Sequence, residues 1–162
     1  MKNARKYDSR VTIGAVPDSE DLQQLRDLGY RTLIDLRDDD EKFGGVVEKR
    51  GRELGMAYIG IPIVRDEITM DQVLAFYQDV YRRGSGPLYC FSRHGKRPLA
   101  LLLLLEAVAQ HKPLSFIFRR AAKFGMNLEG DLSLNAFLTE FYNSGKMEPI
   151  VAAIRQLRPE LL

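Results

Sequence analysis

The sequence predicts a single-domain α/β protein: a three-layer sandwich with a central, mainly parallel sheet of about four strands and a helical C-terminal third. Three observations lead to this prediction. Short apolar runs alternate with longer helix-like segments four times between residues 11 and 110. Beyond residue 111 the pattern is helical throughout. The chain has 162 residues, 45% of them hydrophobic, which is enough to bury one sizeable core.

The strands are expected where short apolar runs are bounded by glycine, proline or charged residues. They span residues 11–16, 31–36, 56–61 and 88–90. Because a helical segment separates each strand from the next, right-handed crossovers should make the sheet parallel and cover both of its faces.

The helices are expected between these strands, with recognisable starts and stops. Asp18 is a candidate N-cap for a helix that Gly29 ends as the C′ residue. Thr69 and Gln72 form a capping-box pattern that opens a helix running to residue 80. The other predicted helices span residues 46–54, 98–110, 113–124, 132–143 and 148–157.

Composition excludes several classes of protein. The formal net charge of +2 is too small to argue for nucleic acid. The longest apolar stretch, residues 99–109 with Glu106 inside it, is about half a membrane span. Residues 1–7 are basic but lead into no apolar segment, unlike a signal peptide. One cysteine cannot form an internal disulfide, so we expect a reducing, cytoplasmic environment. No repeat or linker divides residues 1–162, and a single domain is expected.

The most informative segment is residues 88–98. It places the chain's one cysteine, Cys90, between a short strand and a proline-initiated helix, and Arg93, Lys96 and Arg97 lie in the connection. Helix N-termini bind anions, and a helix start or a nearby cation lowers the pKa of a thiol. Ligands of parallel sheets bind where strands end. The segment therefore predicts an ionised thiol facing an anion site, and hence phosphate-ester chemistry.

This layout resembles the cysteine-dependent protein tyrosine and dual-specificity phosphatases, especially their small bacterial members, over residues 10–110. The resemblance rests on Ile13-Gly14 with Pro17, on Leu28-Gly29 followed by residues 33–37, on Ile61-Pro62 and on the loop after residue 89.

The resemblance implies that Cys90 attacks the phosphorus of a phosphate monoester and forms a phosphocysteine, while Arg97 binds the phosphate. No metal or organic cofactor is required, and the implied partner is a phosphorylated substrate or a phosphate-like anion. The residues expected to cradle the phosphate are Phe91, Ser92, Arg93, His94, Gly95, Lys96 and Arg97.

The loop departs from the family signature, which is His-Cys, five residues, Arg and then Ser or Thr. Six residues separate Cys90 from Arg97, so that Lys96 holds the strictly spaced position. Tyr89 stands where the family has histidine, and Pro98 where it has the hydroxyl residue. The glycine usual three places after the cysteine is also displaced, to position 95. An alternative is therefore a pseudo-phosphatase that binds a phosphorylated partner or an anion without turnover. Rhodanese-like sulfur transfer through the same cysteine is a further alternative.

A general acid is expected from the loop before the cysteine strand. Asp66 is the candidate, and Asp71 is the second choice because the helix dipole already explains its position. A solvated loop residue is an equally good interpretation of Asp66. Two histidines and one cysteine argue against a zinc site. Stacking of nucleic acid on Tyr89 and Phe91 is disfavoured by their strand-like spacing.

Two further segments are expected to be structural. The resemblance implies that Asp35-Leu36-Arg37 forms an ion pair or loop anchor beside the rim of the site. The acidic residues 38–41 are expected to form a solvated loop. Neither the natural substrate nor the oligomeric state can be predicted.

Overall fold

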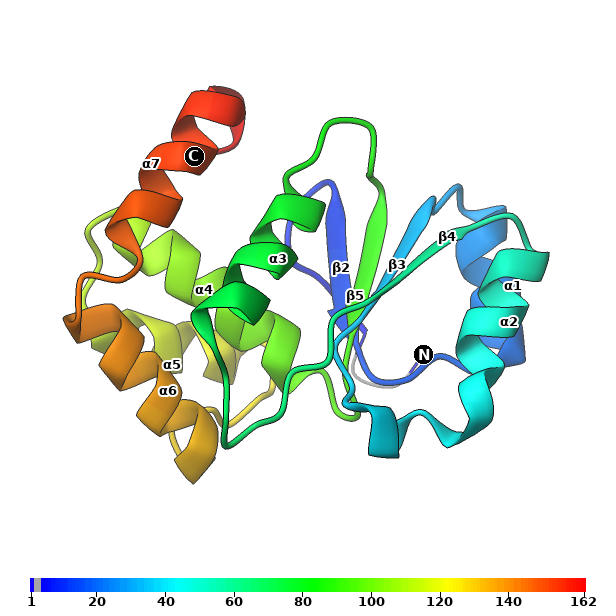
Figure 1. The fold of residues 1–162 in the computed structure, drawn as a ribbon, viewed down its shortest axis with the longest axis horizontal. Coiled ribbons are helices and arrows are strands. Elements are labelled where there is room, and N and C mark those ends of the chain that lie inside the picture. Colours follow the sequence, from blue (N-terminus) through cyan, green and yellow to red (C-terminus); the bar gives the residue numbers. More distant parts are fainter. Residues whose placement is uncertain (2–3) are drawn as a thin grey trace. The chain divides into compact units, whose positions relative to one another are not determined.

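The computed structural model describes residue 1 and residues 4–162, which form two compact units, Met1–Pro98 and Leu99–Leu162. The first unit carries the sheet and three helices, and the second is helical (Figure 1). The alternation of strands and helices and the helical C-terminal third are confirmed. A single domain spanning residues 1–162 stays a prediction.

The sheet has five strands in the order β1-β2-β5-β3-β4. All neighbours are parallel except β1 and β2, so the mainly parallel sheet is confirmed. The short edge strand β1 was not predicted, because its two charged residues carry no apolar pattern. The strands are β1 (Arg5–Lys6), β2 (Val11–Gly14), β3 (Thr32–Asp35), β4 (Ala57–Gly60) and β5 (Leu88–Phe91).

The helices begin and end close to where the sequence places them. The side chains of Asp18 and Thr69 accept hydrogen bonds from the N–H groups of Asp21 and Gln72, so both predicted caps are confirmed. The α-helices are α1 (Ser19–Asp27), α2 (Val46–Glu53), α3 (Met70–Val80), α4 (Lys96–Ala109), α5 (Leu114–Lys123), α6 (Leu132–Asn143) and α7 (Glu148–Leu157). Short 3₁₀ turns follow at η1 (Asp39–Glu41), η2 (Phe43–Gly45) and η3 (Pro159–Leu161).

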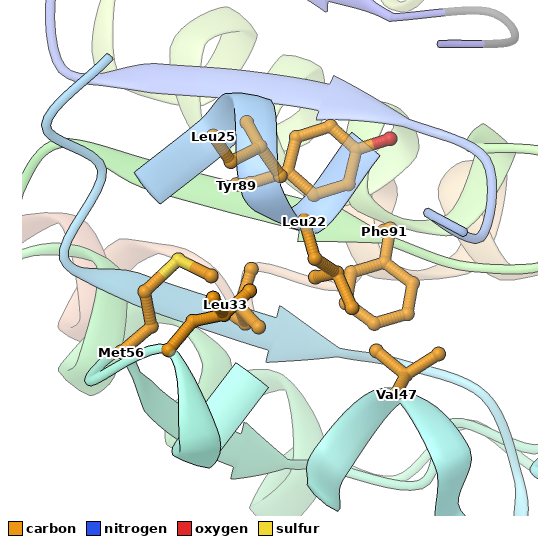
Figure 2. Packing of buried hydrophobic residues seen from close by; sticks show 8 residues of the cluster. Leu22, Leu25, Leu33, Val47, Met56, Tyr89 and Phe91 are labelled. Atoms are coloured by element: carbon orange, nitrogen blue, oxygen red, sulfur yellow. The ribbon is translucent and has the colours of Figure 1, made fainter. Parts of the chain in front are cut away.

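Helices α1 and α2 cover one face of the sheet, and α3 lies on the opposite side (Figure 1). Side chains of α1, α2 and β3 meet Tyr89 and Phe91 of β5 in a buried cluster (Figure 2). The two aromatic rings stack with their centroids 5.7 Å apart. Gly14 makes room for this arrangement, since a Cβ atom there would lie 2.3 Å from the Tyr89 hydroxyl oxygen.

The parallel strands end together at one edge of the sheet. Beyond the last paired residues, Leu36 N–H donates to the Phe91 carbonyl at 2.9 Å, and Ile63 N–H donates to the Leu36 carbonyl at 3.2 Å. Ser92 N–H donates to the Gly14 carbonyl at 3.4 Å. The segments that follow β2, β3, β4 and β5 are therefore gathered at this carboxyl edge, where parallel sheets bind ligands.

The unit from Leu99 to Leu162 is organised by its own contacts. Phe137 and Phe141 of α6 lie with ring centroids 4.5 Å apart, and the Tyr142 hydroxyl donates to the Lys112 carbonyl at 2.6 Å. Among the helices of residues 4–162, none is both long and apolar enough to cross a membrane.

Candidate phosphate-binding site

The loop between β5 and α4 runs from Ser92 to Gly95. Gly95 has a φ of 87°, in the left-handed region that favours glycine. Its N–H donates to the Ser92 side-chain oxygen at 3.1 Å, which folds the loop back over its first residue. Helix α4 begins at Lys96, and the first N–H groups of a helix have no partners within the helix. This turn at a helix start has the form of an anion cradle.

Cys90 does not lie in this loop. It is the third residue of β5, where it pairs with Ile13 of β2 and Ile34 of β3, and it is fully buried. Burial raises the pKa of the Cys90 thiol, and the negative charge of Asp8 acts in the same direction. The expectation of an ionised thiol facing the anion site is therefore wrong. Strand β5 continues one residue further than predicted, and Cys90 is part of the sheet.

The observed loop is also shorter than the predicted phosphate cradle of residues 91–97. Phe91 is the last residue of β5, is fully buried and belongs to the core cluster of Figure 2, so it is not a loop residue. Lys96 and Arg97 lie in the first turn of α4, because the helix begins two residues before Pro98. Proline is tolerated in a first helical turn, where its missing N–H costs nothing. The loop itself then consists of residues 92–95, with Arg93 and His94 exposed.

Arg97 is buried and held by the segments after β3 and β4. Its Nη1 donates to Glu41 Oε1 at 2.8 Å, to the Leu36 carbonyl at 3.1 Å and to the Ile63 carbonyl at 3.2 Å. Its Nη2 donates to Glu41 Oε2 at 2.8 Å. The pair of bonds to Glu41 is the two-pronged arrangement that fixes a guanidinium in one orientation.

This orientation leaves one edge of the guanidinium without a hydrogen-bond partner among the described residues. Arginine has five N–H groups, and the bonds described above occupy both on Nη1 and one on Nη2 of Arg97. The N–H on Nε and the second N–H on Nη2 form a second fork. Such a fork matches two oxygens of a phosphate.

Glu41 is a site residue that the sequence did not reveal. The expected solvated loop of residues 38–41 contains the carboxylate that orients Arg97, 56 positions away. Hydrogen bonds from Arg97 lower the pKa of the Glu41 carboxyl, although partial burial opposes this. No local pattern links the two positions. The one available indication is the capping-box spacing of Asp38 and Glu41, which points to local structure and not to an arginine partner.

A buried ion pair supports the segment that carries Glu41. Asp35 accepts from Arg37 Nε at 3.0 Å, from Arg37 Nη2 at 2.8 Å and from the Tyr58 hydroxyl at 2.5 Å. Arg37 Nη1 in turn donates to the Glu41 carbonyl at 3.2 Å. The expected structural role of Asp35-Leu36-Arg37 is confirmed, and the pair connects the end of β3 to the residue that holds Arg97.

The surroundings of the loop are electropositive. The pKa of His94 is lowered by partial burial and by the charges of Arg93, Lys96, Arg65 and Arg97, which together disfavour a further cation. A hollow of about 310 Å³ adjoins the loop at Arg93 and is also lined by Val16, Arg37, Asp40, Glu41 and Phe43. A larger hollow of about 470 Å³ lies between α1 and α2 and is lined by none of residues 92–97.

Asp66 lies in the exposed turn between β4 and α3, where Glu67 N–H closes onto the Val64 carbonyl at 2.9 Å. This turn directly follows Ile63, the residue whose carbonyl accepts from Arg97. Asp66 is therefore three residues along the chain from a contact of the site, and its role as a general acid stays a prediction. Among the described residues, no cluster of three or more His, Cys, Asp or Glu side chains could hold a metal ion.

The Glu41–Arg97 contact makes a prediction for stability at acid pH. The pKa of Glu41 in the folded chain lies below its ordinary value of 4.5, so ionised Glu41 stabilises the fold above pH 4.5. This contribution is lost as the pH falls from 4.5 through the lowered pKa. In urea unfolding from pH 7 to pH 3, the stability gap between wild type and Glu41→Gln should be constant down to about pH 5 and then narrow. The exposed Glu53→Gln is the control, and a gap that stays constant to pH 3 would contradict the prediction.

Residues 2–102 match the PTP-NADK family, described as "DSP-PTPase phosphatase fused to NAD+ Kinase". The match covers more than half of the chain. The chain belongs to this family. The resemblance to protein tyrosine and dual-specificity phosphatases is thereby confirmed, and PTP-NADK membership supports a phosphatase function. The match includes the loop, Glu41 and Arg97, and it ends within α4.

Individual relatives agree with PTP-NADK membership. A putative phosphatase from Neisseria meningitidis is 26% identical with a TM-score of 0.65, covering 80% of this chain and 93% of that one. A Cys→Ser variant of Pseudomonas aeruginosa TpbA, solved with phosphotyrosine, shares the fold at 14% identity and a TM-score of 0.70, covering 94% of this chain and 90% of that one. The beta-lactamase hydrolase-like protein of Agrobacterium fabrum is 30% identical over 109 residues. That alignment covers 65% of this chain but 25% of the relative, so the chain spans about a quarter of such relatives.

Proposed function

We propose that the chain binds a phosphate monoester in the loop and helix start from Ser92 to Arg97. The observation that carries the proposal is the oriented guanidinium of Arg97, whose bonds to Glu41 leave a two-pronged N–H fork for a ligand. Family membership supports the same conclusion, because phosphatases act on phosphate esters. The ligand of TpbA, phosphotyrosine, is one member of the class that we propose for this chain.

The remaining features of the site suit a dianion. The amides at the start of α4 carry a partial positive charge, and Arg93 and Lys96 add full charges beside the loop. The backbone turn at Gly95 points its N–H to the inside of the loop, where it donates to the Ser92 side chain, as in backbone anion cradles. We propose a phosphorylated protein or a small phosphorylated molecule as the partner.

Hydrolysis through a phosphocysteine at Cys90, with Asp66 as the general acid, is the second candidate, and family membership favours it. It requires a thiolate in contact with the bound phosphorus. The thiol of Cys90 is instead buried between Ile13 and Ile34, and burial raises its pKa. This placement supports ester binding over turnover by Cys90. Sulfur transfer through a persulfide on Cys90 meets the same obstacle.

Calorimetric titration with inorganic phosphate and with p-nitrophenyl phosphate tests the proposal. We expect saturable one-to-one binding of both ligands, with each displacing the other. Cys90→Ala should bind phosphate as the wild type does, because the side chain is buried in β5 outside the loop. Absence of binding up to about 10 mM ligand would contradict the proposed function. Loss of binding in a folded Cys90→Ala variant would instead show that Cys90 contributes to the phosphate-binding site.

A further inference from the structure

The residue at the base of the loop is Ser92. It is the first residue beyond the end of β5, and its N–H donates to the carbonyl of Gly14 at the end of β2. Its exposed fraction is 1%, so its side chain is enclosed at the point where the chain turns from the sheet into the loop. Position 92, and not position 90, is thus the place where β5 delivers a side chain to the carboxyl edge of the sheet.

The loop is folded around the side-chain oxygen of Ser92. The Gly95 N–H points at this atom at a distance of 3.1 Å, and the left-handed conformation of Gly95 permits the approach. An N–H donor and a helix start are the two features that stabilise a negatively charged atom. Because the Ser92 oxygen accepts from a loop N–H next to the start of α4, it lies where the proposed phosphate would be held.

Cys90 has none of these features. Its neighbours in the sheet are Ile13 and Ile34. Because successive side chains of a strand point to opposite faces of the sheet, Cys90 lies on the face opposite to the cluster residues Tyr89 and Phe91. Phe91, the last residue of β5, therefore separates Cys90 from the loop along the chain. An attacking group in this fold would have to come from position 92.

We propose that position 92 is the nucleophile position of this phosphatase fold, and that the native serine makes the loop a site that holds a phosphate monoester without cleaving it. This inference rests on the proposed function. A serine hydroxyl is a weak nucleophile unless a base removes its proton. The side-chain hydrogen bond of Ser92 runs in the opposite sense, with the oxygen accepting from Gly95 N–H.

A thiol at position 92 would allow the site to hydrolyse the bound phosphate monoester. In Ser92→Cys, the loop N–H and the start of α4 would favour the thiolate. The thiolate would attack phosphorus, forming the S–P bond as the P–O bond to p-nitrophenol breaks, and p-nitrophenolate would leave with the electron pair. Water would then cleave the S–P bond, releasing inorganic phosphate and returning the thiolate.

The experiment compares the wild type, Ser92→Cys, and Ser92→Cys combined with Cys90→Ala, all verified as folded by circular dichroism. We expect both variants with a thiol at position 92 to hydrolyse p-nitrophenyl phosphate about 100-fold or more faster than the wild type. Acid quenching during turnover should trap a phosphocysteine at position 92 in both variants, as identified by peptide mass spectrometry. Cys90 should carry no phosphoryl group.

The inference is overturned if folded Ser92→Cys binds phosphate but is inactive and forms no phosphocysteine at position 92. It is also overturned if the wild type itself converts the ester and loses that activity in Cys90→Ala. Phosphorus NMR of the wild type with p-nitrophenyl phosphate needs no variant at position 92: the bound ester should persist, and its conversion would contradict the inference. Failure of the wild type to bind phosphate at all counts against the proposed function and is read from the calorimetry.

Discussion

The Arg97→Lys variant is expected to bind inorganic phosphate at least about tenfold more weakly than the wild-type chain. Lysine keeps the positive charge but replaces the planar fork with a single ammonium group. It cannot hold Glu41 through two parallel hydrogen bonds and present two further N–H groups to a ligand at the same time. The loss should therefore exceed what a change of charge alone would cause.

The same variant should also be less stable. Arg97 donates to the carbonyls of Leu36 and Ile63. The Leu36 carbonyl keeps the Ile63 N–H as a donor, whereas loss of the donor to the buried Ile63 carbonyl costs about 1–3 kcal/mol. Urea unfolding gives the stability, and calorimetry on protein verified as folded gives the affinity. Arg119→Lys, at an exposed position of α5, is the matched control and should change neither. Wild-type affinity in Arg97→Lys would show that the phosphate lies elsewhere.

The Asp35→Asn variant is expected to lose about 3–5 kcal/mol of unfolding free energy. Asp35 is fully buried and accepts three hydrogen bonds from Arg37, which is itself 3% exposed. The amide keeps the size of the carboxylate but removes the charge, which leaves the Arg37 cation buried without its counter-ion. Tyr58 also loses a charged acceptor for its hydroxyl.

Glu48→Gln makes the same change from carboxylate to amide at a surface ion pair with Arg52, where both side chains are about half exposed. An exposed pair contributes about 0–1 kcal/mol, so this control should unfold almost as the wild type does. Equal losses of unfolding free energy in the two variants, measured by urea unfolding at pH 7, would mean that the buried pair stabilises the fold no more than the exposed pair does. Because Arg37 also donates to the Glu41 carbonyl, Asp35→Asn should weaken phosphate binding as well.

Most of the helices and strands could be predicted because the residue patterns that determine them lie within short segments of the sequence. Strands of alternating or continuous apolar residues, and caps such as Asp18 and Thr69, are properties of short segments. The predicted bounds agree with the observed ones to within about two residues, which is the usual uncertainty of helix ends. Strand β1 was not predicted because it has two residues and pairs at an edge of the sheet, where no buried face imposes an apolar pattern.

The site was harder to predict because its decisive details are small shifts and distant contacts. A strand end moved by one residue adds Phe91 to the sheet, so that Cys90 is no longer the last residue of its strand, and makes Ser92 the first residue of the loop. The apolar character of Phe91 favours this, because it extends the buried run of β5. The cations that follow at Arg93, Lys96 and Arg97 favour instead a thiol that faces an anion site. The pairing of Glu41 with Arg97 joins two loops that only the folded sheet brings together.

The position of Cys90 bears on how the protein meets oxidants. Peroxide inactivates thiol enzymes by reacting with an accessible thiolate, which it converts to sulfenic and higher acids. The chain's one sulfhydryl is enclosed in the middle strand of the sheet and is held in its protonated form. The folded protein therefore offers peroxide no thiolate, and the phosphate-ester binding proposed for this chain should persist under oxidative conditions that inactivate cysteine-dependent phosphatases.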